Sequence, residues 1–197
     1  MTGLRRIQIG LWIMAGLATL AYGALTLLPK PSAQTEEAAF RPVFALPDGG
    51  GRLRTTDEFA GKFQLVFFGF TNCPDVCPTT LSEVAQVMDD LGDDATFVQP
   101  IFISIDPERD RRLGIDAFTQ AFHPAILGLA GDARETKATA ASFKIFFAQE
   151  ETPEVADGYT MSHSSALYLI GPEGDWLRQF DYGTSAADIQ SDLNSRF

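Results

Sequence analysis

Two cysteines, four positions apart, are the residues of this 197-residue chain most able to carry chemistry. Cys73 and Cys77 are its only cysteines, and they lie between an apolar run, 65–70, and a helical pattern, 78–91. A proline follows Cys77, so we expect Cys77 to be the N-cap of that helix and Pro78 its first residue. A helix N-terminus stabilises negative charge, which predicts a lowered pKa for the Cys77 thiol and accessible thiolates.

This thiol pair could form a disulfide, act as a redox couple or bind a metal. A structural disulfide would close a loop of only three residues, and its entropic contribution would be small. A redox dithiol more usually has two intervening residues, and the wider spacing suits a metal held between two thiolates. Thiolates select Cu(I), and an added imidazole can also hold Cu(II). Zinc with two cysteines, one histidine and water stays an alternative.

A two-thiolate site needs a third ligand, and the chain has two histidines. His123 precedes a proline at a predicted helix end, where a structural role fits best. His163 lies between an irregular segment and a buried strand, and is the candidate ligand. Asp75 and Asp106 could orient His163 or modulate the thiolates, although a solvated loop and a helix cap are their simpler roles. Met161 is expected to pack rather than bind metal.

The N-terminal segment is the most apolar part of the chain. Residues 7–28 carry no charge, and a stretch of about 20 apolar residues can span a bilayer. Arg5 and Arg6 precede it and Lys30 follows, so the positive-inside rule places the N-terminus in the cytoplasm. We therefore expect a single-pass anchor in the inner membrane, within residues 1–30, and a periplasmic domain beyond it.

The rest of the chain is expected to form one acidic domain, 40–197, after a linker over 31–39. Residues 31–197 carry 26 acidic and 12 basic side chains, a net charge of −14, which argues against nucleic-acid binding. The order of apolar runs and helical patterns predicts an α/β fold with a mixed sheet, helices on both faces and a terminal hairpin. Expected strands are 40–46, 52–56, 63–70, 95–105, 126–129, 165–170 and 176–180; expected helices are 78–91, 113–122, 132–143 and 185–193; 144–162 is expected to be irregular.

Several separated blocks of the sequence resemble the Sco/SenC family of thioredoxin-like, copper-handling proteins. The blocks are GFTNCPDVCPTTL at 69–81, SIDPERD at 104–110, FHP at 122–124 with GLAG at 128–131, and HS at 163–164 followed by YLIGPEG at 168–174. The resemblance covers roughly residues 40–195. It implies a thioredoxin-like fold, an N-terminal anchor, and copper bound by Cys73, Cys77 and His163.

The resemblance also implies a partner and a role. Members of the family deliver copper to the binuclear copper site of cytochrome c oxidase, or reduce the thiols of that site, so a copper acceptor and a thiol reductant are the expected partners. This chain departs from the family at Asn72, usually histidine, at Ser162, usually aspartate, and at Arg111–Arg112. The Ser162 change removes an acidic group beside His163. A thiol–disulfide oxidoreductase or redox sensor is the alternative function; a peroxidase on the same fold fits the cysteine spacing less well.

Overall fold

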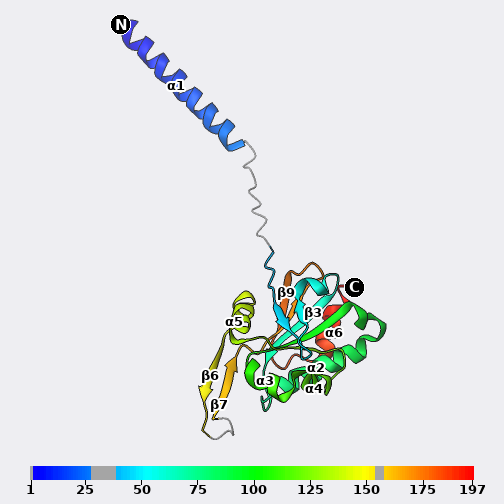
Figure 1. Cartoon of the computed structure of the whole chain (residues 1–197). Coiled ribbons are helices and arrows are strands. Elements are labelled where there is room, and N and C mark those ends of the chain that lie inside the picture. Colours follow the sequence, from blue (N-terminus) through cyan, green and yellow to red (C-terminus); the bar gives the residue numbers. More distant parts are fainter. Residues whose placement is uncertain (1, 28–38, 154–157) are drawn as a thin grey trace. The chain divides into compact units, whose positions relative to one another are not determined.

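The computed structural model describes residues 2–27, 39–153 and 158–197, and divides the chain into two units, Met1–Ala38 and Ala39–Phe197. The first unit contains helix α1 (Thr2–Leu27), which covers most of the predicted anchor (Figure 1). Among the described residues, no helix meets the length and apolar character that a membrane span requires, so the expected transmembrane helix is not confirmed. The predicted linker, 31–39, lies outside the described residues except for Ala39.

The second unit is built on a mixed five-stranded sheet with the strand order β5-β4-β3-β8-β9. Strand β3 is parallel to β4, and β4 to β5, whereas β8 is antiparallel to both β3 and β9. This arrangement confirms the predicted mixed sheet and terminal hairpin. The strands are β3 (Phe63–Gly69), β4 (Val98–Ser104), β5 (Leu127–Leu129), β8 (Leu167–Ile170) and β9 (Trp176–Phe180).

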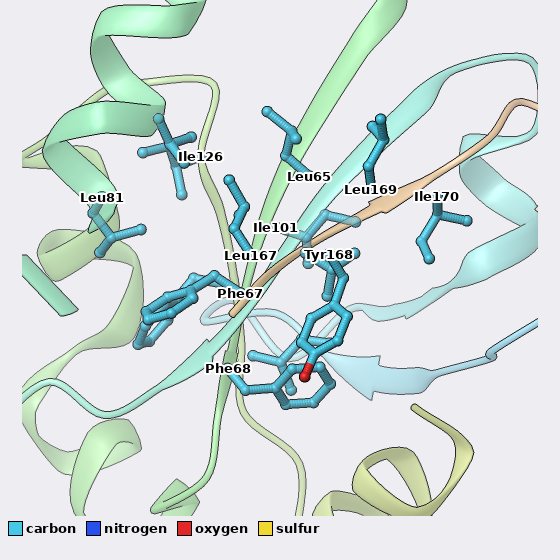
Figure 2. Packing of buried hydrophobic residues seen from close by; sticks show 14 of the residues in the cluster. Leu65, Phe67, Phe68, Leu81, Ile101, Ile126, Leu167, Tyr168, Leu169 and Ile170 are labelled. Carbon is cyan, nitrogen blue, oxygen red and sulfur yellow. The ribbon is translucent and has the colours of Figure 1, made fainter. Parts of the chain in front are cut away.

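Strand β3 is the centre of the hydrophobic core, and all seven of its residues are buried. Successive side chains of a strand point to opposite faces of a sheet. Phe67 accordingly packs against Phe102, while Phe68 packs edge-on against Phe143 and Tyr168. Figure 2 shows Phe68 beside Tyr168. Both faces of β3 are therefore covered, as its continuous apolar sequence predicts.

Helices flank the sheet, with α2 packed against α6 and α3 against α5. The predicted helix over 113–122 corresponds to α4, which begins only at Ile115 because Gly114, with a φ of 86°, separates it from α3. A short 3₁₀ segment, Gly92–Phe97, delays the start of β4. The helices are α2 (Val76–Leu91), α3 (Pro107–Leu113), α4 (Ile115–Gln120), α5 (Ala133–Ser142) and α6 (Ala186–Asn194), with a further 3₁₀ turn, η1 (Thr56–Phe59).

The expectation that 144–162 is irregular was wrong. Strands β6 (Phe147–Glu151) and β7 (Tyr159–His163) form an antiparallel ribbon, which extends away from the five-stranded sheet in Figure 1. The ribbon places Phe147 opposite His163 in the ladder. Its residues are partly or fully exposed, so the sequence lacks the alternation of apolar and polar residues that marks a half-buried strand.

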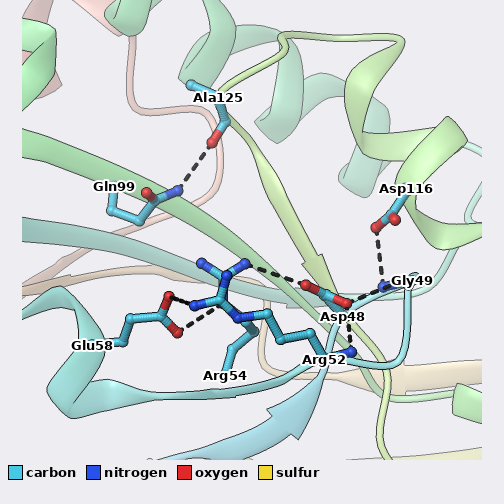
Figure 3. Close-up of polar contacts among 9 residues, drawn as sticks. Asp48, Gly49, Arg52, Arg54, Glu58, Gln99, Asp116 and Ala125 are labelled. Carbon is cyan, nitrogen blue, oxygen red and sulfur yellow. Dashed lines mark hydrogen bonds and ion pairs between the residues drawn. The ribbon is translucent and has the colours of Figure 1, made fainter.

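A small N-terminal hairpin lies against the β5 edge of the sheet. It consists of β1 (Ala45–Pro47) and β2 (Leu53–Thr55), a shorter first strand than predicted. Asp48 forms a β-bridge with Leu129, and its carboxylate lies 3.2 Å from the Arg54 guanidinium (Figure 3). The Gly49 N–H donates to the Asp116 carboxylate, which ties the hairpin turn to α4. These contacts join the hairpin to β5 and α4.

Candidate functional site

The two cysteines lie at the carboxyl end of β3, where the chain turns into α2, and both are free thiols. The helix begins at Val76, so Asp75 and not Cys77 occupies the N-cap position. Cys77 lies in the first turn with no exposed surface, whereas Cys73 is only partly buried. The prediction that Cys77 is the N-cap was therefore wrong, and only Cys73 is open to solvent.

The pKa shifts of the two thiols are also the reverse of the expectation, which assigned the lowered pKa to Cys77. A hydrogen bond from the Cys77 thiol lowers the pKa of Cys73 to about 5, and the amides of Asp75 and Cys77 and the nearby His163 act in the same direction. The Cys77 N–H lies 3.4 Å from the Cys73 sulfur. The pKa of Cys77 is raised, because its proton is shared with Cys73 and because it is buried. The helix N-terminus thus stabilises a thiolate at Cys73.

A glycine at the end of β3 makes room for the buried thiol. A Cβ atom on Gly69 would lie 2.7 Å from the Cys77 sulfur and 2.8 Å from the Phe102 ring. Such separations are well inside van der Waals contact. Glycine therefore allows the first turn of α2 to pack its thiol directly against the strand.

A buried carboxylate, which we did not predict as a site residue, holds the loop that precedes Cys73. Asp110 on α3 is fully buried and accepts hydrogen bonds from the Thr71 N–H at 3.0 Å, the Thr71 hydroxyl at 2.7 Å and the Ser104 hydroxyl at 2.6 Å. Burial raises the pKa of Asp110, and these hydrogen bonds oppose that shift. Two signals in the sequence pointed toward it: the cluster of charges after the apolar run of β4, and the position of Asp110 at the end of the block 104–110 that resembles the Sco/SenC family.

His163 ends strand β7 and packs edge-on against the rings of Phe67 and Phe70 at centroid separations of 6.2 and 6.1 Å. Its Nδ1 atom lies 2.8 Å from the Ser164 carbonyl oxygen. A carbonyl can only accept a hydrogen bond, so Nδ1 carries the proton and, in a neutral ring, Nε2 keeps a free lone pair. This is the tautomer that a histidine needs to bind a metal through Nε2.

Phe70 links the cysteine loop to His163, because its carbonyl accepts the Cys73 N–H at 3.2 Å and its ring lies 6.1 Å from the imidazole. In the described part of the chain, no three side chains of the histidine, cysteine, aspartate or glutamate type already converge as a metal cluster. His123 has the expected structural role: its Nδ1 accepts the Ala125 N–H, and its Nε2 lies 3.5 Å from Asp89.

The two aspartates proposed to orient His163 have other contacts. The Asp75 carboxylate lies 3.4 Å from the Thr79 hydroxyl, and Asp106 forms an ion pair with Arg109 at 2.6 Å. Met161 packs against the hydrophobic core, as expected. The carbonyl of Ser164, rather than either aspartate, is the group that accepts a hydrogen bond from His163.

A thiol pair at the strand-to-helix turn of a mixed α/β sheet, beside a histidine on a separate ribbon, defines a thioredoxin-like domain with a potential metal or redox site. The chain belongs to the SCO1/SenC family, whose model matches residues 32–197. This confirms the resemblance seen in the sequence.

Relatives in bacteria and mitochondria support this assignment. An SCO2-like protein of Rickettsia felis is 35% identical over 150 residues, which cover 76% of this chain and 73% of the relative. The human mitochondrial SCO1 homologue is 34% identical over 152 residues, which cover 76% of this chain and 50% of the human protein. This chain therefore matches about half of the human protein.

Solved structures show the same fold. Copper-bound ScoI of Bradyrhizobium japonicum superimposes with a TM-score of 0.73 at 35% identity, covering 81% of this chain and all of that one. Copper-bound yeast Sco1 gives a TM-score of 0.70 at 31% identity, covering 80% of this chain and 87% of the yeast chain.

Proposed function

We propose that this protein is a copper chaperone that binds one copper ion through Cys73, Cys77 and His163. The observation that carries the proposal is the partly buried Cys73 thiol at the start of α2, whose pKa is lowered to about 5. A thiolate is the form that binds metal; the low pKa supplies it at Cys73 at neutral pH, whereas Cys77 must release its proton when the metal binds. The B. japonicum and yeast relatives were both solved with copper bound, which supports copper as the metal.

The donor set suits a metal that must be released again. Two thiolates satisfy Cu(I), and the Nε2 atom of His163 adds a donor that Cu(II) accepts. Cys73 is the reachable donor, because Cys77 is buried. We propose that copper leaves by ligand exchange, with an acceptor thiol replacing Cys73 first.

Cytochrome c oxidase is the proposed destination of the copper. BsSco, another structural relative at 26% identity and a TM-score of 0.61, is described as a member of the Sco family of cytochrome c oxidase assembly proteins. The acceptor would be the subunit that holds the binuclear copper site, or another copper protein. The acidic domain would favour an acceptor with a basic docking surface.

The location of the protein is a further part of the proposal. The uncharged residues 7–28, with Arg5 and Arg6 before them and Lys30 after them, support an inner-membrane anchor with a periplasmic domain. Fusing alkaline phosphatase or β-galactosidase after Ala39 tests the orientation. An active phosphatase and an inactive galactosidase support it, and the opposite pair of results contradicts it.

Copper titration of the reduced full-length chain tests the ligand assignment. Wild type should bind one Cu(II), and His163→Ala should weaken that binding by at least about tenfold and remove nitrogen splitting from the electron paramagnetic resonance spectrum. His123→Ala is the matched control and should behave like wild type. Unchanged Cu(II) affinity and an unchanged spectrum in His163→Ala would show that His163 is not a ligand.

A thiol–disulfide oxidoreductase is the second candidate function, favoured by the asymmetry of the two thiols. The Cys73 thiolate would attack a partner disulfide and form a mixed disulfide as one partner sulfur leaves as a thiolate. Cys77, after losing its proton, would then displace the second partner sulfur. The partner gains two electrons, and Cys73 and Cys77 become a disulfide.

The two functions differ in their need for His163. Reduction of a disulfide substrate should be lost in Cys73→Ser and retained in His163→Ala if the protein is an oxidoreductase. Deleting the gene and measuring oxidase activity distinguishes the roles in the cell. Lost activity that added copper restores supports copper delivery; unaffected oxidase activity contradicts it.

A further inference from the structure

A buried arginine joins the segment that carries the thiols to the ribbon that carries His163. Arg109, on α3, is only 2% exposed. Its guanidinium lies over the Tyr159 ring at 4.4 Å and over the Phe70 ring at 5.5 Å. It also pairs with the Asp106 carboxylate at 2.6 Å. We call these four residues, Phe70, Asp106, Arg109 and Tyr159, the arginine clamp.

Each member of the clamp belongs to a segment of the proposed site. Phe70 follows β3, its carbonyl accepts the Cys73 N–H, and its ring packs against His163. Tyr159 begins strand β7, of which His163 is the last residue. Positions 159 and 163 are four apart, so their side chains leave the same face of the strand. The clamp therefore contacts both the chain entering the cysteine loop and the far end of the histidine strand.

The hydroxyl of Tyr159 adds a polar contact to the clamp. It lies 3.1 Å from the nearer oxygen of Asp106, the carboxylate that also pairs with Arg109. A planar guanidinium can stack face to face on an aromatic ring while its edge bonds to a carboxylate, whereas an ammonium group has no planar face to stack. In the described part of the chain, the ribbon pairs with no strand of the five-stranded sheet, so side-chain contacts hold it in place: those of the clamp, and the packing of Phe147, Met161 and His163 against the core.

From this geometry we infer that Arg109 and Tyr159 are positioning residues that hold the β6–β7 ribbon so that His163 faces the thiol pair. The inference rests on the proposed copper site and adds the device that presents its third ligand. Loosening the clamp lowers the fraction of molecules with His163 in place. The apparent affinity for a metal that needs the imidazole is the intrinsic affinity multiplied by that fraction, so it falls in proportion.

Tyr159→Ala in the full-length chain tests the clamp first without copper. Hydrogen exchange at the described ribbon amides, 147–151 and 159–163, should become at least about tenfold faster, while exchange in β3 and β4 stays unchanged. Tyr159→Phe keeps the ring under Arg109 and should restore most of the protection. Tyr182→Ala removes a half-exposed tyrosine outside the clamp and should leave the ribbon unaffected. Unchanged ribbon exchange in Tyr159→Ala would overturn the inference, whatever the copper results.

Copper binding then tests whether the clamp acts through His163. Tyr159→Ala should weaken Cu(II) binding by about tenfold and should have no further effect when added to His163→Ala. An equal additional loss in the double variant would overturn the positioning role. If the ribbon loosens but His163→Ala binds copper like wild type, the clamp stands and the proposed ligand set fails. Arg109→Lys, which keeps the charge without the planar stack, should resemble Tyr159→Ala.

Discussion

Replacing Cys77 by alanine should raise the pKa of the Cys73 thiol from about 5 to between about 6 and 7. The substitution removes the hydrogen bond from the Cys77 thiol, which is the largest contribution to the low pKa. The backbone N–H of residue 77 and the N-terminus of α2 remain, so the pKa should stay below its ordinary value of 9.0.

The size of the shift follows from the energy of one hydrogen bond to a charged group. Such a bond contributes about 1.5–3 kcal/mol, and one pKa unit corresponds to about 1.4 kcal/mol, so its loss is worth about one to two units. At pH 6 the thiolate fraction of Cys73 should fall from about 90% to between about 10% and 50%.

The assay is the pH dependence of alkylation by iodoacetamide in the reduced protein. The midpoint of the profile is the quantity to compare, because a thiolate with a higher pKa is intrinsically more nucleophilic and the rate at one pH mixes the two effects. Cys73→Ala is the control: the buried Cys77 thiol that remains should react slowly. A wild-type midpoint near 9, or an identical midpoint in Cys77→Ala, would refute the proton-sharing account.

Other predictions concern stability and packing. The folded-state pKa of Cys73 lies below its unfolded value of 9.0, so its stabilising contribution should grow between pH 5 and 9 and disappear as the pH falls through 5. After allowance for its exposure, this amounts to about 1 kcal/mol at pH 7, and urea unfolding of Cys73→Ser should show a flatter profile. Gly69→Ala should cost about 1–3 kcal/mol, since its Cβ would overlap the Cys77 sulfur; a thermal midpoint equal to wild type would contradict this. Thr71→Val should destabilise the fold by about 1–3 kcal/mol through loss of the hydroxyl bond to buried Asp110, measured by urea unfolding, and an effect below 0.5 kcal/mol would contradict the importance of that bond.

The segment from β3 to α2 was the most predictable part of the fold. An apolar run followed by two prolines and a helical pattern specifies a buried strand, a turn and a helix within one stretch of sequence. The thiol pKa values were not predictable in the same way. The helix N-terminus is a local feature, but the burial of Cys77 and its proton sharing with Cys73 depend on packing against β3.

The surroundings of His163 show the other limit of sequence reasoning. The ribbon that carries it is acidic and partly exposed, and Pro153 and Gly158 at its turn suggest an irregular segment. Its strands are recognisable only through their pairing with each other. Asp110 was missed for a related reason: a carboxylate in a charged helix is usually solvated, and nothing local shows that this one is buried.

The β1–β2 hairpin covers part of the edge strand β5. A strand at a sheet edge offers unpaired backbone groups to any other extended chain, including a second copy of the same protein. The Asp48–Leu129 bridge and the hydrogen bond from the Ala130 N–H to the Pro47 carbonyl occupy part of that edge. Residues 45–55 precede β5 in the chain, so the segment that covers this edge is already synthesised when β5 emerges. In the folded protein, the hairpin leaves less of the β5 edge open to pairing with another chain.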